Sequence, residues 1–411
     1  MPAPATATAG WRIVAVFAVT QTIGYGTLYY AFAVLLQPIA RDLHTSPTTV
    51  TGAFTTAIVT SALMAVPVGR WLDRHGGRAV MTLGALAGAA LLVAWSRTDA
   101  VWQLYAVFVG LGAAMAMVLY EPATAVIVSW FEPAARPRAI LAMIVVAGFA
   151  STIFMPLTGL LTDRLGWRAT LIILAAVYGT VAVPLHALVI RRPPAARSGR
   201  PPPNGGELVR AALRDGRFWC LAGAFLAHGA AMSTMTVHLV SFLTGEGHPA
   251  PFGATVAGLL GLLSVTGRLV LTAAQRRIRL TTVVAAVFTV QALAALSLPV
   301  VGSTTAGAVV AVIGFGLGFG VASLASPILL ANRYGTAAYA SIAGALATPV
   351  TLAKATAPLG AAALATRAGY PTTLTAVAAA CLLAAAGIVA RSKSPAPAHV
   401  KAGVNAGRRE G

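Results

Sequence analysis

Charged residues are scarce in this chain of 411 residues. They make up 9% of the sequence, whereas roughly a quarter of the residues in a soluble domain are charged. Hydrophobic residues make up 58%, and the mean hydropathy is +0.81. This composition excludes a soluble enzyme. Because one membrane crossing needs roughly 20 apolar residues, a chain of this length has room for about twelve crossings.

Cysteine, lysine and catalytic motifs are also sparse. The two cysteines, Cys220 and Cys381, lie in apolar runs and predict neither a disulfide framework nor a metal site. Lysine occurs three times and never after a glycine, which excludes the phosphate-binding loop of an ATP-driven pump. No H-E-x-x-H or G-x-S-x-G motif indicates a hydrolase. We therefore expect no enzyme activity, no cofactor and no metal.

The net charge of +19 comes mostly from arginines that lie between apolar runs, so it predicts membrane orientation rather than a nucleic-acid surface. With a cytoplasmic N-terminus, 23 lysines and arginines lie inside and five lie outside. The positive-inside rule therefore predicts that both termini are cytoplasmic in a multi-pass protein of the cell inner (plasma) membrane. The apolar runs, of about 20 to 28 residues each, start near Trp11, Thr48, Ala79, Val101, Arg138, Arg168, Phe218, Phe252, Leu280, Thr304, Ala338 and Tyr370.

The longest polar interruption lies between the sixth and seventh runs. Residues 191–217 begin with a Pro- and Gly-rich stretch, which predicts a cytoplasmic linker between halves 1–190 and 218–391, with a tail at 392–411. Within the linker, ELVRAALRDG favours a short amphipathic helix on the membrane surface. Two halves of six spans indicate the internal duplication of secondary carriers, which alternate access around a midplane site.

One loop motif points to a family. GRWLDRHGGR, between the second and third runs, resembles the G-x-x-x-D-R-x-G-x-R signature of the major facilitator superfamily. The matched positions are Gly69, Asp73, Arg74, Gly76 and Arg78. The resemblance implies an all-α membrane fold of twelve transmembrane helices in two pseudo-symmetric six-helix halves. It also implies a monomer in the lipid bilayer that transports a small molecule and has no nucleic-acid partner.

The same residues are predicted to form a conformational gate. We expect Asp73 to face the positive N-terminal end of a helix in the other half, in a contact that forms in one conformation and breaks in the other. The corresponding segment of the second half, GRLVLTAAQRRIR, keeps three arginines but has no aspartate. The second half therefore has no obvious acid for a gate of this kind.

Ionisable residues within the apolar runs are candidates for a substrate site. Each costs on the order of 3 kcal/mol to insert into the membrane, so its presence there indicates a function. Arg268 in the eighth run and Lys354 in the eleventh predict an anion site in which both hold a carboxylate. The pair resembles that of the oxalate/formate antiporters and related monocarboxylate porters, which implies a mono- or dicarboxylate substrate. Alternatively, Arg268 extends its stem to the cytoplasmic surface and has a purely structural role.

The first and fourth runs supply further candidates. Tyr25 and Tyr29 are four residues apart, so they share a helix face and either wall a small cavity or pack in the core. Glu121 is the only deeply placed carboxylate, and desolvation is expected to keep it protonated, which makes it the candidate for proton coupling. If Glu121 binds the substrate instead, the protein is a proton-coupled efflux carrier for hydrophobic or cationic compounds. A membrane sensor or scaffold without transport is a third alternative.

Overall fold

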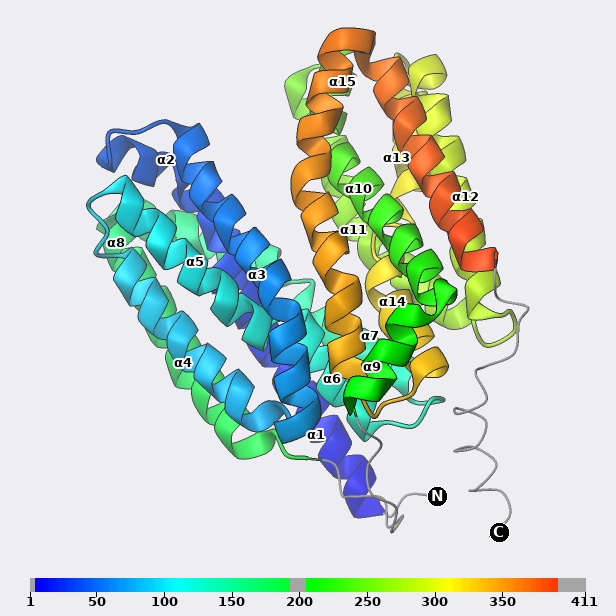
Figure 1. Ribbon diagram of the computed structural model, residues 1–411. Coiled ribbons are helices and arrows are strands. Elements are labelled where there is room, and N and C mark those ends of the chain that lie inside the picture. Colours follow the sequence, from blue (N-terminus) through cyan, green and yellow to red (C-terminus); the bar gives the residue numbers. More distant parts are fainter. Residues whose placement is uncertain (1–3, 193–204, 391–411) are drawn as a thin grey trace. The chain divides into compact units, whose positions relative to one another are not determined.

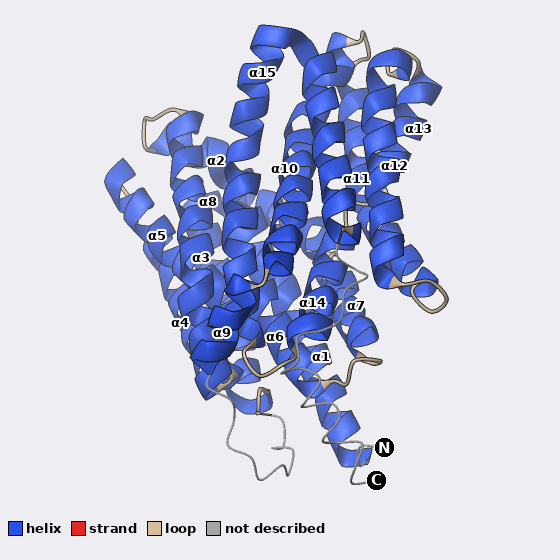
Figure 2. Cartoon of the chain, turned by 45° about the vertical axis from the view of Figure 1, so that its right-hand side comes forward, coloured by secondary structure: helices blue, strands red, loops and turns tan. Residues whose placement is uncertain are grey.

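The computed structural model describes residues 4–192 and 205–390, and every regular element in this part of the chain is a helix (Figure 1, Figure 2). Ten helical stretches of the described residues are long and apolar enough to cross a membrane. Two of these stretches each contain two helices, because the backbone leaves the helical conformation at Gly166 (φ +79°) and Gly369 (φ +80°). A positive φ at such a position favours glycine. The twelve-span, all-α fold expected from the sequence is thus confirmed.

The helices group into two compact units. Of the described residues, the first unit holds 4–192, 205 and 337–348, and the second holds 206–336 and 349–390. The helices of the first unit are α1 (Pro4–Gly24), the π-helix η1 (Tyr25–Tyr30), α2 (Ala31–Asp42), α3 (Pro47–His75), α4 (Gly77–Trp95), α5 (Val101–Val118), α6 (Tyr120–Trp130), α7 (Arg136–Ala147) and α8 (Ala150–Val189). Those of the second are α9 (Gly205–Arg214), α10 (Gly216–Gly245), α11 (Ala250–Ala274), α12 (Leu280–Val301), α13 (Thr305–Gly316) and α14 (Val321–Tyr334). The last helix, α15 (Tyr339–Val389), has its first ten residues in the first unit and the remainder in the second.

Each unit has its own apolar core. In the first unit the rings of Trp95 and Phe108 meet at 4.8 Å, and both side chains are almost completely buried. The core of the second unit contains Phe242 and Phe315, which are also almost completely buried. Because lipid tails are as apolar as these side chains, helices that cross a membrane are held together by close van der Waals packing of such residues.

Several of the expected spans are interrupted. Leu119 takes an extended conformation between α5 and α6, η1 lies between α1 and α2, and residues 317–320 separate α13 from α14. Irregular backbone at membrane depth requires partners for its freed polar groups. Gln21 Nε2 donates to the Val118 carbonyl at 2.6 Å, and Gln291 Nε2 donates to the Phe315 carbonyl at 2.8 Å. One buried glutamine therefore satisfies the carbonyl end of a broken helix in each unit.

Candidate functional site

Asp73 caps the first turn of α15 within the first unit. The backbone N–H of Ala340 donates to Oδ1 at 2.9 Å, and that of Ser341 donates to Oδ2 at 2.8 Å. The first N–H groups of a helix have no partner within the helix and carry positive partial charge, so a carboxylate is stabilised there. This is a bidentate contact between the end of α3 and the start of α15.

The glycines of the same motif allow this approach. A Cβ atom at Gly69 would lie 2.3 Å from the Ala340 carbonyl oxygen, so a larger residue would push α3 away from α15. Gly76 has a φ of +77° and ends α3. Arg192 donates to the carbonyl of Arg74 at 2.5 Å, whereas the side chains of Arg74 and Arg78 are exposed. Within this unit the motif thus places one buried glycine and one capping carboxylate against α15.

The second unit has an acidic residue that the sequence analysis did not single out. Asp215 accepts a hydrogen bond from the Arg217 N–H at 3.1 Å and caps α10. Its Oδ2 also accepts from the Arg333 guanidinium at 2.9 Å and from the Tyr334 hydroxyl at 3.1 Å, at the end of α14. An aspartate directly before an apolar run is a helix N-cap signature, so the signal was present in the sequence.

Replacing Asp215 is expected to make stability less dependent on pH. Burial acts to raise the pKa of this carboxyl, but hydrogen bonds from Arg217, Arg333 and Tyr334 outweigh burial and lower the pKa. Because the pKa is lower in the folded state, the ionised carboxylate stabilises the fold at pH values above the unfolded-state pKa of about 3.9. This stability is lost as the pH falls below that value. Asp215→Asn should therefore melt at a lower temperature than the parent at pH 7. Thermal unfolding of the detergent-solubilised protein between pH 3 and 7 should show the difference shrinking below about pH 4.

Arg268 lies inside the second unit, on α11. Its residue exposure is 9%, and Nε donates to the Gly320 carbonyl and to Ser323 Oγ, each at 3.3 Å. A Cβ atom at Gly320 would come within 2.7 Å of Nε, so the glycine gives the guanidinium room. The side chain therefore contacts the interruption between α13 and α14, instead of extending to the surface as the structural alternative assumed.

Lys354 lies on α15 in the second unit, and its side chain is exposed. Its stem passes over α10, where a Cβ atom at Gly229 would lie 3.2 Å from Lys354 Cε. Ser233 Oγ donates to the Lys354 carbonyl at 2.5 Å. The stem is thus held against α10, while Arg268 contacts α14. The two predicted anion-binding residues lie in the same unit and are held by different helices.

Tyr25 and Tyr29 belong to an aromatic cluster in the first unit. Their rings are 6.0 Å apart in η1, the ring of Tyr25 lies 4.4 Å from that of Tyr120, and Tyr29 meets Phe54 at 5.1 Å. The two predicted tyrosines are half-buried, so they have a packing role and a partly exposed edge at the same time. The cluster therefore joins η1 to α3 and α6.

Glu121 follows Tyr120 in the first turn of α6, directly after the interruption at Leu119. Its side chain is exposed, so the folded chain does not enclose it as the desolvation argument assumed. Because α6 begins at Tyr120, Glu121 lies near the positive end of that helix, where a carboxylate is favoured. Of the predicted residues, Glu121 and the tyrosines thus belong to the first unit, and the two cations belong to the second.

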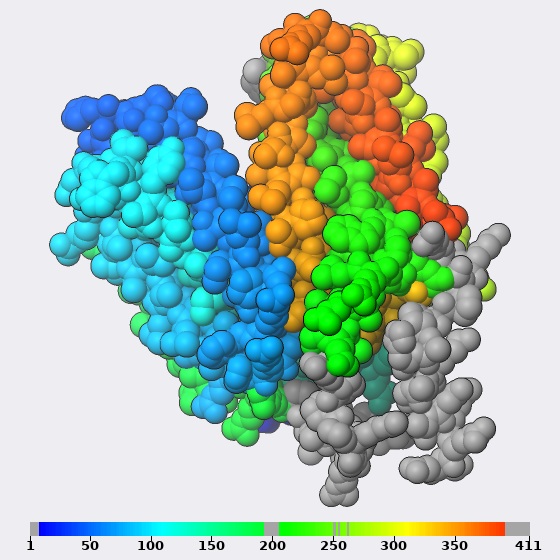
Figure 3. All heavy atoms as spheres, in the orientation of Figure 1, coloured from blue at the N-terminus to red at the C-terminus, as the bar shows by residue number. Residues whose placement is uncertain are grey.

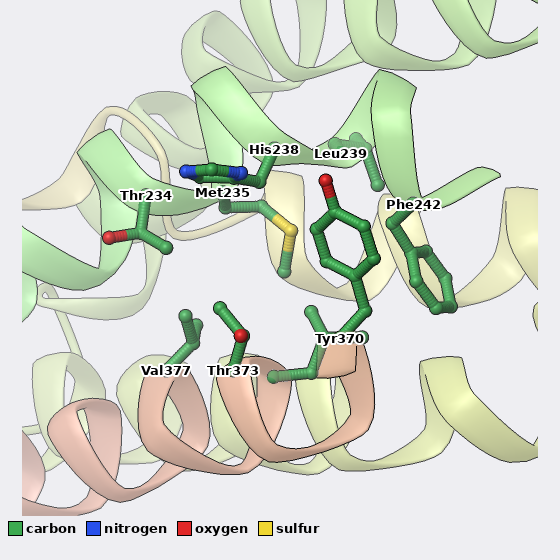
Figure 4. Close-up of a pocket in the computed structure, with 9 residues that line it drawn as sticks. Thr234, Met235, His238, Leu239, Phe242, Tyr370, Thr373 and Val377 are labelled. Atoms are coloured by element: carbon green, nitrogen blue, oxygen red, sulfur yellow. The ribbon is translucent and has the colours of Figure 1, made fainter. Parts of the chain in front are cut away.

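A small cavity lies between α10 and α15 in the second unit (Figure 4). Its volume of about 10 Å³ is sufficient for roughly one water molecule, so an organic substrate does not fit. His238 closes one side, where its Nε2 lies 3.0 Å from the Pro358 carbonyl oxygen. The lining residues are Thr234, Met235, His238, Leu239, Phe242, Tyr370, Thr373, Leu374 and Val377.

Comparison with known proteins agrees with the family that the fold and the loop motif indicate. Residues 17–353 match the family model of the Major Facilitator Superfamily. The chain belongs to this superfamily. It is therefore a multi-pass integral membrane protein of a superfamily of transporters, whose members bind small molecules.

Individual relatives of this superfamily member are distant. The chain is 25% identical over 270 residues to the "uncharacterized MFS-type transporter YcxA" of Bacillus subtilis, a match that covers 60% of the chain and 63% of the relative. The structure is similar to that of the E. coli fucose:proton symporter FucP, with a TM-score of 0.76, 13% identity and coverage of 93% and 98% of the two chains. The human organic anion transporter MFSD10 gives a TM-score of 0.70 at 18% identity, with coverage of 92% and 99%. At these identities the structural likeness shows the fold alone.

Proposed function

We propose that the protein is a secondary transporter that moves a small organic anion, a mono- or dicarboxylate, across the plasma membrane by alternating access. The observation that carries this proposal is Lys354, a lysine in the middle of an apolar helix whose stem is held against α10. A cation at that depth is costly and marks a functional site by default. An anionic substrate would offset the cost, because its charge compensates the ammonium.

Arg268 supplies the second positive charge in the same unit. Its contacts with Gly320 and Ser323 hold the guanidinium beside an interrupted helix, the kind of element that forms substrate sites in secondary carriers. The similarity of Arg268 and Lys354 to the pair in oxalate/formate antiporters supports the same substrate class. Antiport and symport are both compatible with this site.

Asp73 is proposed to close the cytoplasmic side. Its two hydrogen bonds to the start of α15 form a contact that a moving helix would break, as a gate requires. The distribution of arginines supports cytoplasmic termini. We propose that a single chain is the working unit.

The direct test is a transport panel in proteoliposomes. Radiolabelled formate, lactate, oxalate and succinate would be offered with and without a pH gradient, against protein-free vesicles. We expect saturable uptake of at least one carboxylate. Uptake of lipophilic cations with no carboxylate flux would overturn the proposal, and absence of any solute flux would favour a sensor or scaffold.

A second candidate, proton-coupled efflux of hydrophobic or cationic compounds, rests on Glu121. The exposed carboxylate adjoins Tyr120, whose ring lies 4.4 Å from that of Tyr25, and a carboxylate beside aromatic rings suits a cation. In this alternative Lys354 and Arg268 have structural roles only.

Glu121→Gln separates the two candidates. If Glu121 carries the coupling proton of a carboxylate carrier, the variant should lose accumulation driven by a pH gradient and keep exchange of substrate for substrate. If Glu121 binds a cationic substrate, the variant should lose both modes for that cation. Glu132→Gln, which removes an exposed glutamate beyond the other end of α6, is the matched control and should change neither mode.

A further inference from the structure

Helix α9 has two different faces. Arg210 and Arg214 are four residues apart, so they lie on one side of the helix, and both are exposed. Most of the apolar residues lie on the other side, where Ala212 is 2% exposed. Leu213, at the edge of that side, is 37% exposed. The helix therefore presents a face that carries two arginines and Glu207, three residues before Arg210, and an exposed apolar edge at Leu213.

The position of α9 at the membrane follows from its connection to α10. Only Asp215 separates the two helices, and α10 is long and apolar enough to cross the membrane. Trp219 in the first turn of α10 is 57% exposed, and its Nε1 donates to the Leu213 carbonyl at 2.8 Å. Tryptophan is enriched at the level of the lipid headgroups, so α9 is held at that level.

The residue that joins α9 to α10 makes several side-chain contacts. Asp215 caps α10 and binds Arg333 and Tyr334 at the end of α14, so the junction between α9 and α10 is tied to a third helix. Figure 3 shows α9 and the start of α10, in green, at the surface of the molecule. The two arginines thus lie on the helix that directly precedes a membrane span.

We propose that α9 binds anionic phospholipid headgroups of the cytoplasmic leaflet. Arg210 and Arg214 would hold the phosphates, because a guanidinium matches phosphate oxygens with paired hydrogen bonds. Leu213 and Trp219 would enter the boundary between headgroups and acyl chains, as apolar residues of interfacial helices do. Charge complementarity with an anionic leaflet favours this occupant over a soluble protein.

The test uses the full chain in detergent, with Cys220 and Cys381 replaced by alanine. An environment-sensitive fluorophore on Ala211→Cys, an exposed position of α9, would report lipid contact during titration with phosphatidylglycerol or phosphatidylcholine. Each basic residue near a membrane surface changes lipid affinity about fivefold. Arg210→Gln with Arg214→Gln should therefore raise the half-maximal phosphatidylglycerol concentration by about thirtyfold.

Two matched variants decide the interpretation. Arg276→Gln with Arg277→Gln removes the same charge from two exposed arginines in the loop after α11 and should leave the titration within about twofold of the parent. Arg210→Lys with Arg214→Lys keeps the charge and should retain most of the affinity. An equal loss in the control pair, or an equal response of the parent to phosphatidylcholine, would overturn the proposal. A parent fluorophore that responds to neither lipid would do the same, and a soluble partner would become the better candidate.

Discussion

Lys354→Gln and Arg268→Gln are each expected to reduce carboxylate transport by several hundredfold or more. In the proposed substrate complex, removing one of the two cations that bind the carboxylate costs about 3 to 5 kcal/mol, because the substrate charge is left half compensated in a medium of low dielectric constant. Initial rates of uptake in proteoliposomes, at substrate concentrations below and above KM, would measure the loss. Expression and monodispersity should stay near those of the parent for Lys354→Gln, whose side chain is exposed.

Arg268 also has a structural role, so its glutamine variant requires a separate control. Because Nε donates to Gly320 and Ser323, glutamine at this position also loosens the interruption between α13 and α14. Ser323→Ala removes one of these contacts and keeps the positive charge, so it should leave transport within about tenfold of the parent. A loss in Ser323→Ala as deep as in Arg268→Gln would assign the effect to helix packing.

Conservative and distant substitutions complete the test of the anion site. Arg268→Lys should restore little transport, since an ammonium cannot reproduce the planar fork of a guanidinium. Arg277→Gln removes an exposed arginine of the same unit and should have little effect. If both glutamine variants transported carboxylates like the parent, Lys354 and Arg268 would have structural roles only.

Most of the fold was predictable, because length and hydropathy alone decide how many times a chain crosses a membrane. The interruptions within spans were mostly not predictable. Leu119 is as apolar as its neighbours, so a hydropathy pattern that responds to composition gives no sign that the backbone is extended there. The break between α13 and α14 differs from that at Leu119, because α13 ends at Gly316 within the glycine-rich segment GFGLGFG, and glycine is a poor helix former.

The candidate site was predictable where a short motif carries the chemistry. The loop motif singled out Asp73 and predicted a helix N-terminus as its partner, but not which helix, because Ala340 and Ser341 are more than 260 residues away in the sequence. Glu121 shows the opposite limit, since hydropathy does not tell whether a side chain is enclosed by other helices, and the structure leaves this one exposed in the first turn of α6. Contacts between distant segments and local breaks in a helix depend on how the helices pack, and helix packing cannot be predicted from hydropathy and short motifs.

Asp73→Asn is expected to shift the conformational equilibrium toward states that lack the contact with α15. The carboxylate gives one acceptor oxygen to each of two N–H groups, whereas an asparagine has one acceptor oxygen and an amide group that cannot accept. Loss of one hydrogen bond to a charged group, together with the charge at a helix N-terminus, costs about 2 to 3 kcal/mol. The state that contains the contact should therefore become about 30- to 150-fold less favourable relative to the state without it.

The shift can be measured as access to a cysteine introduced at Ala65, in the background without Cys220 and Cys381. The Ala65 carbonyl oxygen lies 2.4 Å from where a Cβ atom of Gly344 would be, so α3 and α15 are in close contact at that point. An impermeant thiol reagent applied from the cytoplasmic side should label this cysteine faster in Asp73→Asn, and substrate turnover should fall. Asp163→Asn, which changes an exposed aspartate elsewhere in the same unit, should alter neither rate.

Gly69→Ala tests the same contact without changing charge. Its Cβ atom would meet the Ala340 carbonyl oxygen at 2.3 Å, so α3 must move away from α15 and weaken the two hydrogen bonds of Asp73. If the contact is the gate, both variants should speed labelling at residue 65 by a similar factor, and combining them should add little, because each removes the same interaction. Unchanged labelling together with unchanged transport in both variants would remove Asp73 from the mechanism, whereas additive effects would show that the glycine and the carboxylate act separately.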